Sequence, residues 1–402
     1  MRTHFINARV IYPDRVETGF VSVEDHTIKA ASAGSPEIAP DDLVYDLNGL
    51  YLSPGFVEIH SHGAGGCDFM DGTAEAVITA AKTHLRHGTT TLYPTTLAAS
   101  REEILSSIDA LRAARRMMTG GPELPGLHME GPYLNPRQKG AIDEKYIRNP
   151  RKEEYEEFIF YGEGAISRWT LAPELPGAAA FVRCLRDHNI VPSMGHTDAE
   201  YSQVLAAYHN GIGHVTHLYS AMSGMVRRGG FRYPGLIESA FCLRDLTVEV
   251  IADGCHLPVE LLQLVYRVKG PEKVALTCDS MRCAGQDVKE SVLGSLKNGQ
   301  RVIIEDGVAK MPDRTAFAGS IATDDRLVRV MYRQAGVPLH DCVRMMTLTP
   351  ASIMGIDRQV GSIMPGKHAN LICFDEDIRV SAVMVQGVMT EGAFGAGKRG
   401  TL

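Results

Sequence analysis

Short apolar segments alternate with helix-forming segments between residues 53 and 355, and this alternation constrains the fold more than any other feature. Eight apolar segments are strand candidates, and amphipathic stretches such as 178–188 and 199–209 separate several of them. A Ser100–Glu103 capping box begins one further helix, and Gly88 marks the end of another. Eight repeats of this kind predict a TIM-like (β/α)8 barrel, with a doubly wound open sheet as the alternative.

The two ends of the chain have a different pattern from the middle. Residues 1–52 and 356–402 contain short alternating apolar runs broken by turn residues, which predicts small strands. Because both ends share this pattern, we expect them to pair into one β-sandwich beside a barrel formed by residues 53–355. The sequence therefore predicts an α/β protein with two domains.

Composition and charge argue against several classes of function. The chain has 402 residues and a formal net charge of −7, so we expect no nucleic-acid partner. No apolar run approaches the roughly 18 residues that a membrane-spanning helix needs, so we expect no membrane partner. Eight cysteines form no CxxC pair and the N-terminus has no signal-peptide apolar region, which predicts free thiols in the cytoplasm.

Side chains that can bind metals or transfer protons follow several of the predicted strands. They are His60, His62, Glu130, His196, His217, His256 and Asp279. Any single one of them is more typically a structural side chain held by hydrogen bonds or an ion pair. Together they supply the imidazole and carboxylate ligands of Zn²⁺ or a similar divalent ion, because the strand ends of a barrel meet around one pocket. The pattern predicts metal-assisted hydrolysis, with Asp279 transferring the proton.

Seven motifs occur in a fixed order along the chain, namely GLHMEGPYLNP, MGHTDA, VTHLYSAM, RYPGL, IADGCH, LTCDSMRCAG and FAGS. In this order they resemble the N-acetylglucosamine-6-phosphate deacetylases of the amidohydrolase superfamily. The resemblance extends from about residue 54 to residue 366. It implies a TIM-like barrel with a terminal β-sandwich, a cytosolic role in amino-sugar catabolism, and a homodimer.

The resemblance also implies a set of metal ligands. Matched to these motifs, Glu130, His196 and His217 are the principal ligands of a divalent metal. Some relatives lack the first-strand histidine pair and hold one ion, so the presence of His60 and His62 implies two ions here, with Glu130 between them. Zinc is the expected metal, and iron or another divalent ion is the alternative.

Catalytic and substrate contacts are implied in the same way. The resemblance makes Asp279 the catalytic acid and base. It assigns the substrate phosphate to His256 and Arg232, and Arg232 is expected to reach into the site of a neighbouring subunit. The positions that match those lining the sugar are Ala141, Ser220, Ala221, Phe317, Ala318 and Gly319.

Two positions depart from the family pattern. Ser220 stands where THLxNAM has asparagine, and Ile142 stands where a histidine or glutamine is common. Loss of polar groups near the sugar or the amide can change the substrate. The sequence predicts deacetylation of N-acetylglucosamine 6-phosphate. The alternatives are deacetylation of another compound, such as N-acetylgalactosamine 6-phosphate or a non-phosphorylated substrate, and a non-catalytic sugar-phosphate-binding protein.

Overall fold

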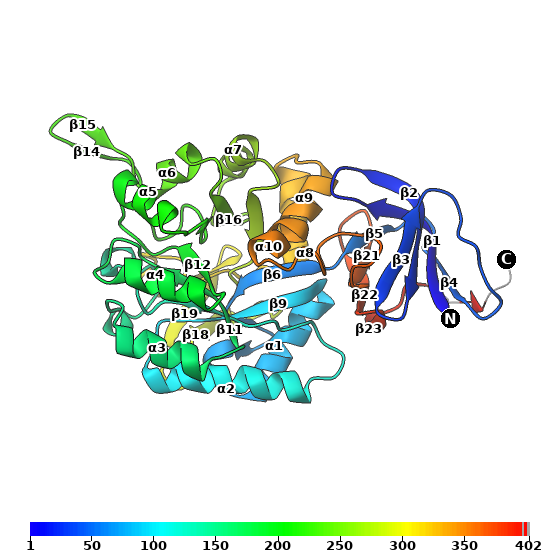
Figure 1. Cartoon of the computed structure of the whole chain (residues 1–402), viewed down its shortest axis with the longest axis horizontal. Coiled ribbons are helices and arrows are strands. Elements are labelled where there is room, and N and C mark those ends of the chain that lie inside the picture. Colours follow the sequence, from blue (N-terminus) through cyan, green and yellow to red (C-terminus); the bar gives the residue numbers. More distant parts are fainter. Residues whose placement is uncertain (396–397, 400–402) are drawn as a thin grey trace.

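Eight parallel strands form the central barrel in a computed structural model that describes residues 1–395 and 398–399 (Figure 1). In order around the barrel they are β6 (Phe56–Ser61), β9 (Thr89–Thr96), β10 (Leu127–Glu130), β11 (Ile166–Leu171), β12 (Val191–Met194), β13 (His214–Val215), β16 (Thr247–Ile251) and β17 (Val274–Thr277). Backbone hydrogen bonds from Asp279 to His60 and from His62 to Ser280 join β17 to β6. The predicted barrel is therefore confirmed.

Helices cover the outside of this barrel (Figure 1). They are α1 (Ala74–Arg86), α2 (Arg101–Met117), α3 (Lys152–Tyr161), α4 (Ala178–Asp187), α5 (Tyr201–His209), α6 (Leu236–Cys242), α7 (Val259–Lys269), α8 (Asp324–Arg329), α9 (Leu339–Met346) and α10 (Leu348–Ile353). The Ser100 hydroxyl accepts a hydrogen bond from the backbone N–H of Glu103, so the predicted capping box begins α2. Helix α1 ends just before Gly88, whose φ of 96° suits a residue without a side chain.

The two ends of the chain form one nine-stranded sheet beside the barrel (Figure 1). Its strands are β1 (Arg2–Ile11), β2 (Val16–Glu24), β3 (Thr27–Ser32), β4 (Leu43–Asp46), β5 (Tyr51–Pro54), β21 (Leu371–Phe374), β22 (Val380–Val385), β23 (Val388–Gly392) and β24 (Lys398–Arg399). Antiparallel pairing of β5 with β21 joins the two ends. Phe394 packs against Phe5 and Tyr45 in a core that belongs to this sheet.

The predicted association of the two termini is thus confirmed. The exact domain boundaries after residues 52 and 355 stay a prediction, and β5 carries the terminal sheet as far as Pro54.

Two insertions extend from the barrel. After β17, the strands β18 (Glu290–Leu293), β19 (Gln300–Glu305) and β20 (Val308–Lys310) form an antiparallel sheet. The hairpin of β14 (Val226–Arg228) and β15 (Phe231–Tyr233) projects away from the barrel at the upper left of Figure 1. The remaining short elements are β7 (Gly63–Ala64), β8 (Cys67–Asp68), 3-10 turns at Phe69–Asp71, Pro136–Gln138 and Glu144–Tyr146, and a π-helical turn at Val330–Gln334. Over the described part of the chain, no helix has both the length and the apolar composition needed to span a bilayer.

Candidate active site

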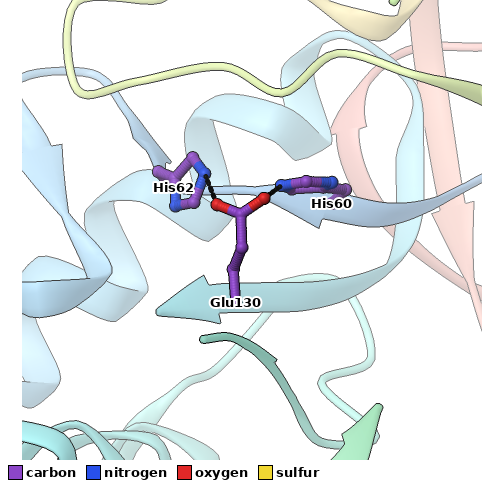
Figure 2. A group of neighbouring side chains, drawn as sticks. All are labelled: His60, His62 and Glu130. Carbon is purple, nitrogen blue, oxygen red and sulfur yellow. Dashed lines mark ion pairs between the residues drawn. The ribbon is translucent and has the colours of Figure 1, made fainter. Parts of the chain in front are cut away.

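Glu130 ends β10 and lies at the centre of a group of buried imidazoles. Its Oε1 atom is 3.2 Å from Nε2 of His196 and 3.1 Å from Nε2 of His217, and these two nitrogens are 3.1 Å apart. The same carboxylate has Oε1 3.4 Å from Nε2 of His60 and Oε2 3.3 Å from Nε2 of His62 (Figure 2). Five side chains from four separate segments of the sequence therefore meet at one end of the barrel.

The donor atoms of these residues fit a metal centre. Two groups share Glu130, one with His60 and His62 and the other with His196 and His217, and each brings three ligand atoms within 4.8 Å of one another. All five residues are at most 5% exposed. Among the described residues Nε2 of His60 has no hydrogen-bond partner, and leaving such a buried nitrogen unpaired costs free energy. Divalent cations bound between these nitrogens and oxygens would satisfy all of them.

Hydrogen bonds at Nδ1 fix the orientation of the His196 and His60 rings. Nδ1 of His196 donates to the backbone carbonyl of Gln138 over 2.8 Å, and Nδ1 of His60 donates to the carboxylate of Glu249 over 2.7 Å. Nδ1 is the donor in each ring, and Nε2 is directed at Glu130, where a metal ion could bind it. This arrangement is typical of histidines that bind metals.

His196, His217 and Asp279 approach the site from left-handed backbone conformations, with φ angles of 47°, 27° and 45°. Each is the second residue after the end of its strand, which is β12, β13 or β17. Residues other than glycine rarely adopt such angles, and the strain costs about 1–3 kcal/mol for each residue. Strain of this kind clusters at functional sites, so the backbone supports a functional role for these three positions.

The carboxylate of Asp279 borders both the imidazoles and the cavity in front of them. Its Oδ1 atom is 3.2 Å from Nε2 of His62 and 3.5 Å from Nε2 of His60. Burial opposes ionisation of this carboxyl, but the neighbouring His60 and His62 outweigh burial and lower the pKa of Asp279 below its usual value. An ionised Asp279 can therefore accept a proton from a molecule in the cavity.

A buried ion pair supports the imidazoles from inside the barrel. Glu249 accepts hydrogen bonds from Nη1 of Arg168 over 2.8 Å and from the backbone N–H of His217 over 3.1 Å, in addition to its bond from His60. Arg168 and Glu249 are both 0% exposed. Burial opposes ionisation of Glu249, but the guanidinium of Arg168 more than compensates and holds the pKa of Glu249 well below its usual range. The sequence analysis did not identify this pair, although charged residues inside apolar strand segments were a visible signal.

The cavity in front of the imidazoles has a volume of about 380 Å³. Seven of the eight predicted substrate contacts line it, namely Ala141, Ser220, Ala221, His256, Phe317, Ala318 and Gly319. Nδ1 of His256 donates to Asp253 over 2.8 Å, which orients the ring beside Phe317. Arg137 and Gln138 also line the cavity and were not predicted, because they lie in a short 3-10 turn without a periodic pattern.

Arg232 is the predicted substrate contact that does not line this cavity. It belongs to β15 of the projecting hairpin, and every residue of β14 and β15 is exposed. The cavity of a single chain is therefore not lined by Arg232.

Comparison with known proteins agrees with this site. The amidohydrolase family model matches residues 51–393. The N-acetylglucosamine-6-phosphate deacetylase of Vibrio furnissii is 32% identical over 341 residues, which cover 85% of this chain and 83% of that protein. The N-acetylgalactosamine-6-phosphate deacetylase of Escherichia coli O157:H7 is 29% identical over 388 residues, covering 96% and 98% of the two chains.

A solved structure is similar over the whole chain. The crystal structure of the N-acetylglucosamine-6-phosphate deacetylase from Pasteurella multocida matches with a TM-score of 0.89 and 29% identity, covering 98% of this chain and 100% of that chain. The resemblance carried by the seven motifs is thus confirmed. This chain belongs to the amidohydrolase family, whose members are metal-dependent hydrolases, and its similar relatives within that family are deacetylases named for amino-sugar phosphates.

Proposed function

We propose that this protein hydrolyses N-acetylglucosamine 6-phosphate to glucosamine 6-phosphate and acetate. The observation that carries the proposal is the convergence of Glu130, His196, His217 and Asp279 at one cavity. A volume of about 380 Å³ lies within the range of pockets that bind small molecules. The chain also covers most of a relative named for this activity.

The metal ligands follow from the two groups around Glu130. We assign one divalent ion to Glu130, His196 and His217, and a second ion to Glu130, His60 and His62. Imidazole and carboxylate ligands suit zinc, which is the metal we propose. A bound ion of this kind supplies Lewis acidity, which polarises the amide carbonyl and lowers the pKa of water.

Asp279 transfers the proton in the proposed reaction. The carboxylate of Asp279 lines the cavity beside the imidazoles, so it can accept a proton from the attacking water. The same proton is then donated to the amine nitrogen as the bond to the acetyl carbon breaks. Asp279 thereby serves as base and acid in turn.

We propose that His256 binds the phosphate of the substrate and that Arg232 of a second copy joins it. The hairpin that carries Arg232 exposes Met225, Val226, Phe231 and Tyr233 by 56%, 43%, 73% and 37%. Apolar side chains gathered on a projecting hairpin are typical of a protein interface. A homodimer in which each hairpin packs on the other copy would cover these side chains and bring Arg232 to the partner's cavity.

N-acetylgalactosamine 6-phosphate is the second candidate substrate. A relative named for that activity matches over 96% of this chain, and Ser220 and Ile142, the two departures from the family pattern, both line the cavity.

All eight cysteines are free, as predicted, and we propose that the reaction takes place in the cytoplasm, where thiols stay reduced.

Acetate release from the two acetylated sugar phosphates and from their non-phosphorylated forms tests the proposal. We expect Asp279→Asn to lower turnover by about 10²–10⁴-fold with its metal content unchanged, because a general base is lost. His196→Ala should lose both metal and activity, whereas His256→Ala should raise KM for the phosphorylated sugar more than for its non-phosphorylated form. Acetate release from none of the sugars would contradict the proposal, and metal loss in Asp279→Asn would make that residue a ligand.

A further inference from the structure

An apolar wall lines one part of the active-site cavity. It consists of Leu97, Ile142 and Leu293, which come from the end of β9, the loop after β10 and the end of β18. Ile142 and Leu293 are each 5% exposed. Leu97 packs against the apolar cluster that contains Ile142 and also against the cluster that contains Leu293, so the three side chains form one continuous surface.

The order of the strands places the reacting groups between this wall and His256. Leu97 follows β9 and His256 follows β16, and the other six strands lie between these two around the closed barrel, with β6 and β17 on one side and β10 to β13 on the other. Glu130 ends β10, and His196 and His217 follow β12 and β13. Strand β6 carries His60, and Asp279 follows β17. An amide held at the reacting groups therefore has a polar region on one side and an apolar region on the other. The sugar phosphate suits the side of His256, and the hydrocarbon of the acyl group suits the wall.

A second cavity lies behind the wall. It has a volume of about 40 Å³ and is bordered by the same three residues and by Met70, Ala98, Ala99 and Tyr146. The polar side chains of Glu103, Asp143, Ser295, Asn298 and Gln300 also line it. A water molecule needs roughly 10–15 Å³ of such space, so the second cavity is large enough for a few additional heavy atoms of a longer acyl group. Because Leu97, Ile142 and Leu293 border both cavities, their side chains are the partition between them.

We propose that Leu97, Ile142 and Leu293 set the length of the acyl group that the enzyme removes, an inference that rests on the proposed deacylase function. The end of the acyl chain packs on the partition, and shortening a partition side chain opens the second cavity to longer chains. One methylene group more or less in an apolar pocket changes kcat/KM by about 10–200-fold. A partition of this kind is therefore sufficient to discriminate acetyl from longer acyl groups.

The test compares kcat/KM for the N-acetyl, N-propionyl and N-butyryl derivatives of glucosamine 6-phosphate, measured by release of the free amine. Ile142→Ala and Leu293→Ala should each raise the ratio of butyryl to acetyl activity by about 10-fold or more. Ile142→Val removes a single methyl group and should give a smaller rise. This milder variant also preserves the test if an alanine variant fails to fold, which its melting temperature and metal content would reveal.

Phe317→Ala is the matched control, because Phe317 lines the same cavity beside His256, with ring centroids 4.9 Å apart. It should change KM for all three substrates by a similar factor and leave the butyryl-to-acetyl ratio unchanged. The proposal is overturned if folded, metal-containing Ile142 and Leu293 variants keep the wild-type ratio, or if Phe317→Ala shifts it equally. Failure of the wild-type protein to release amine from any of the three would instead refute the proposed function, and the acyl-length proposal with it.

Discussion

The Glu249→Gln substitution should destabilise the barrel, because it leaves the buried guanidinium of Arg168 without a counter-charge. Both side chains are 0% exposed, and the shortest distance between their charged atoms is 2.8 Å. Removal of one partner from a buried ion pair costs about 3–5 kcal/mol. Since folded proteins are stable by only about 5–15 kcal/mol, we expect a large fraction of the unfolding free energy to be lost.

Urea unfolding followed by the fluorescence of Trp169 measures this loss. Trp169 is the single tryptophan of the chain, is 0% exposed and donates to the backbone carbonyl of Gly131 over 2.8 Å. Its emission therefore reports on the barrel beside Arg168. Glu290→Gln is the control, because Glu290 pairs with Arg301 at the surface, where the side chains are 59% and 65% exposed, and its loss should leave the unfolding midpoint almost unchanged.

The double variant Arg168→Met/Glu249→Gln separates the charge from the packing. Removing both charges should recover part of the stability lost in Glu249→Gln, with a coupling of about 0.5–3 kcal/mol. Glu249→Gln should also weaken metal binding by about 10–100-fold, because Nδ1 of His60 loses its carboxylate partner. The reasoning is refuted if Glu249→Gln unfolds at the same urea concentration as the wild type. It is also refuted if the double variant loses as much unfolding free energy as the single variants Arg168→Met and Glu249→Gln lose together.

Three further predictions concern other parts of the molecule. His60→Ala should halve the metal bound per chain in elemental analysis, and an unchanged content would argue against a second ion. Lys269→Met should lower the unfolding free energy by about 1–3 kcal/mol, because its Nζ donates to three backbone carbonyls at the end of α6. Lys273→Met should have little effect, because it removes only an ion pair of 3.7 Å with the exposed Asp245. Hydrogen bonds from backbone N–H groups, chiefly that of Arg2, lower the pKa of Asp42 in the folded protein. The ionised Asp42 therefore stabilises the fold fully above about pH 4, and this stabilisation is lost as the pH falls further. The difference in urea midpoint between the wild type and Asp42→Asn should therefore narrow from pH 6 to pH 3, and a constant difference would contradict this reasoning.

The barrel and the convergence of the candidate metal ligands could be predicted because local signals marked them. Each barrel strand is buried on both faces, so it appears in the sequence as a short apolar segment, and the histidines stand directly at the ends of such segments. Arg168 and Glu249 could not be predicted as a pair, because they are 81 residues apart and each looks like an isolated charge inside a strand. Only the closed barrel shows that these charges face each other.

Features that depend on how separate loops fold against one another could not be predicted from the sequence either. Leu97, Ile142 and Leu293 belong to three separate segments, and the wall exists only because the insertion after β17 folds against two loops. The hydrogen bond from Gln300 to the carbonyl of Ala141, 2.5 Å long, is one contact that ties this insertion to the loop after β10. The location of Arg232 on an exposed hairpin likewise follows from the fold rather than from its motif.

The pairing of β5 with β21 has a consequence for the order in which the protein is assembled during translation. Strand β5 leads directly into β6, the strand that carries His60, and β5 completes its own pairing only with residues 371–374 near the end of the chain. The ribosome must therefore synthesise residues 371–374 before the pairing that supports the first barrel strand is complete. We therefore expect the proposed metal site at His60 and His62 to bind its ion only after residues 371–374 have been synthesised and have paired with β5.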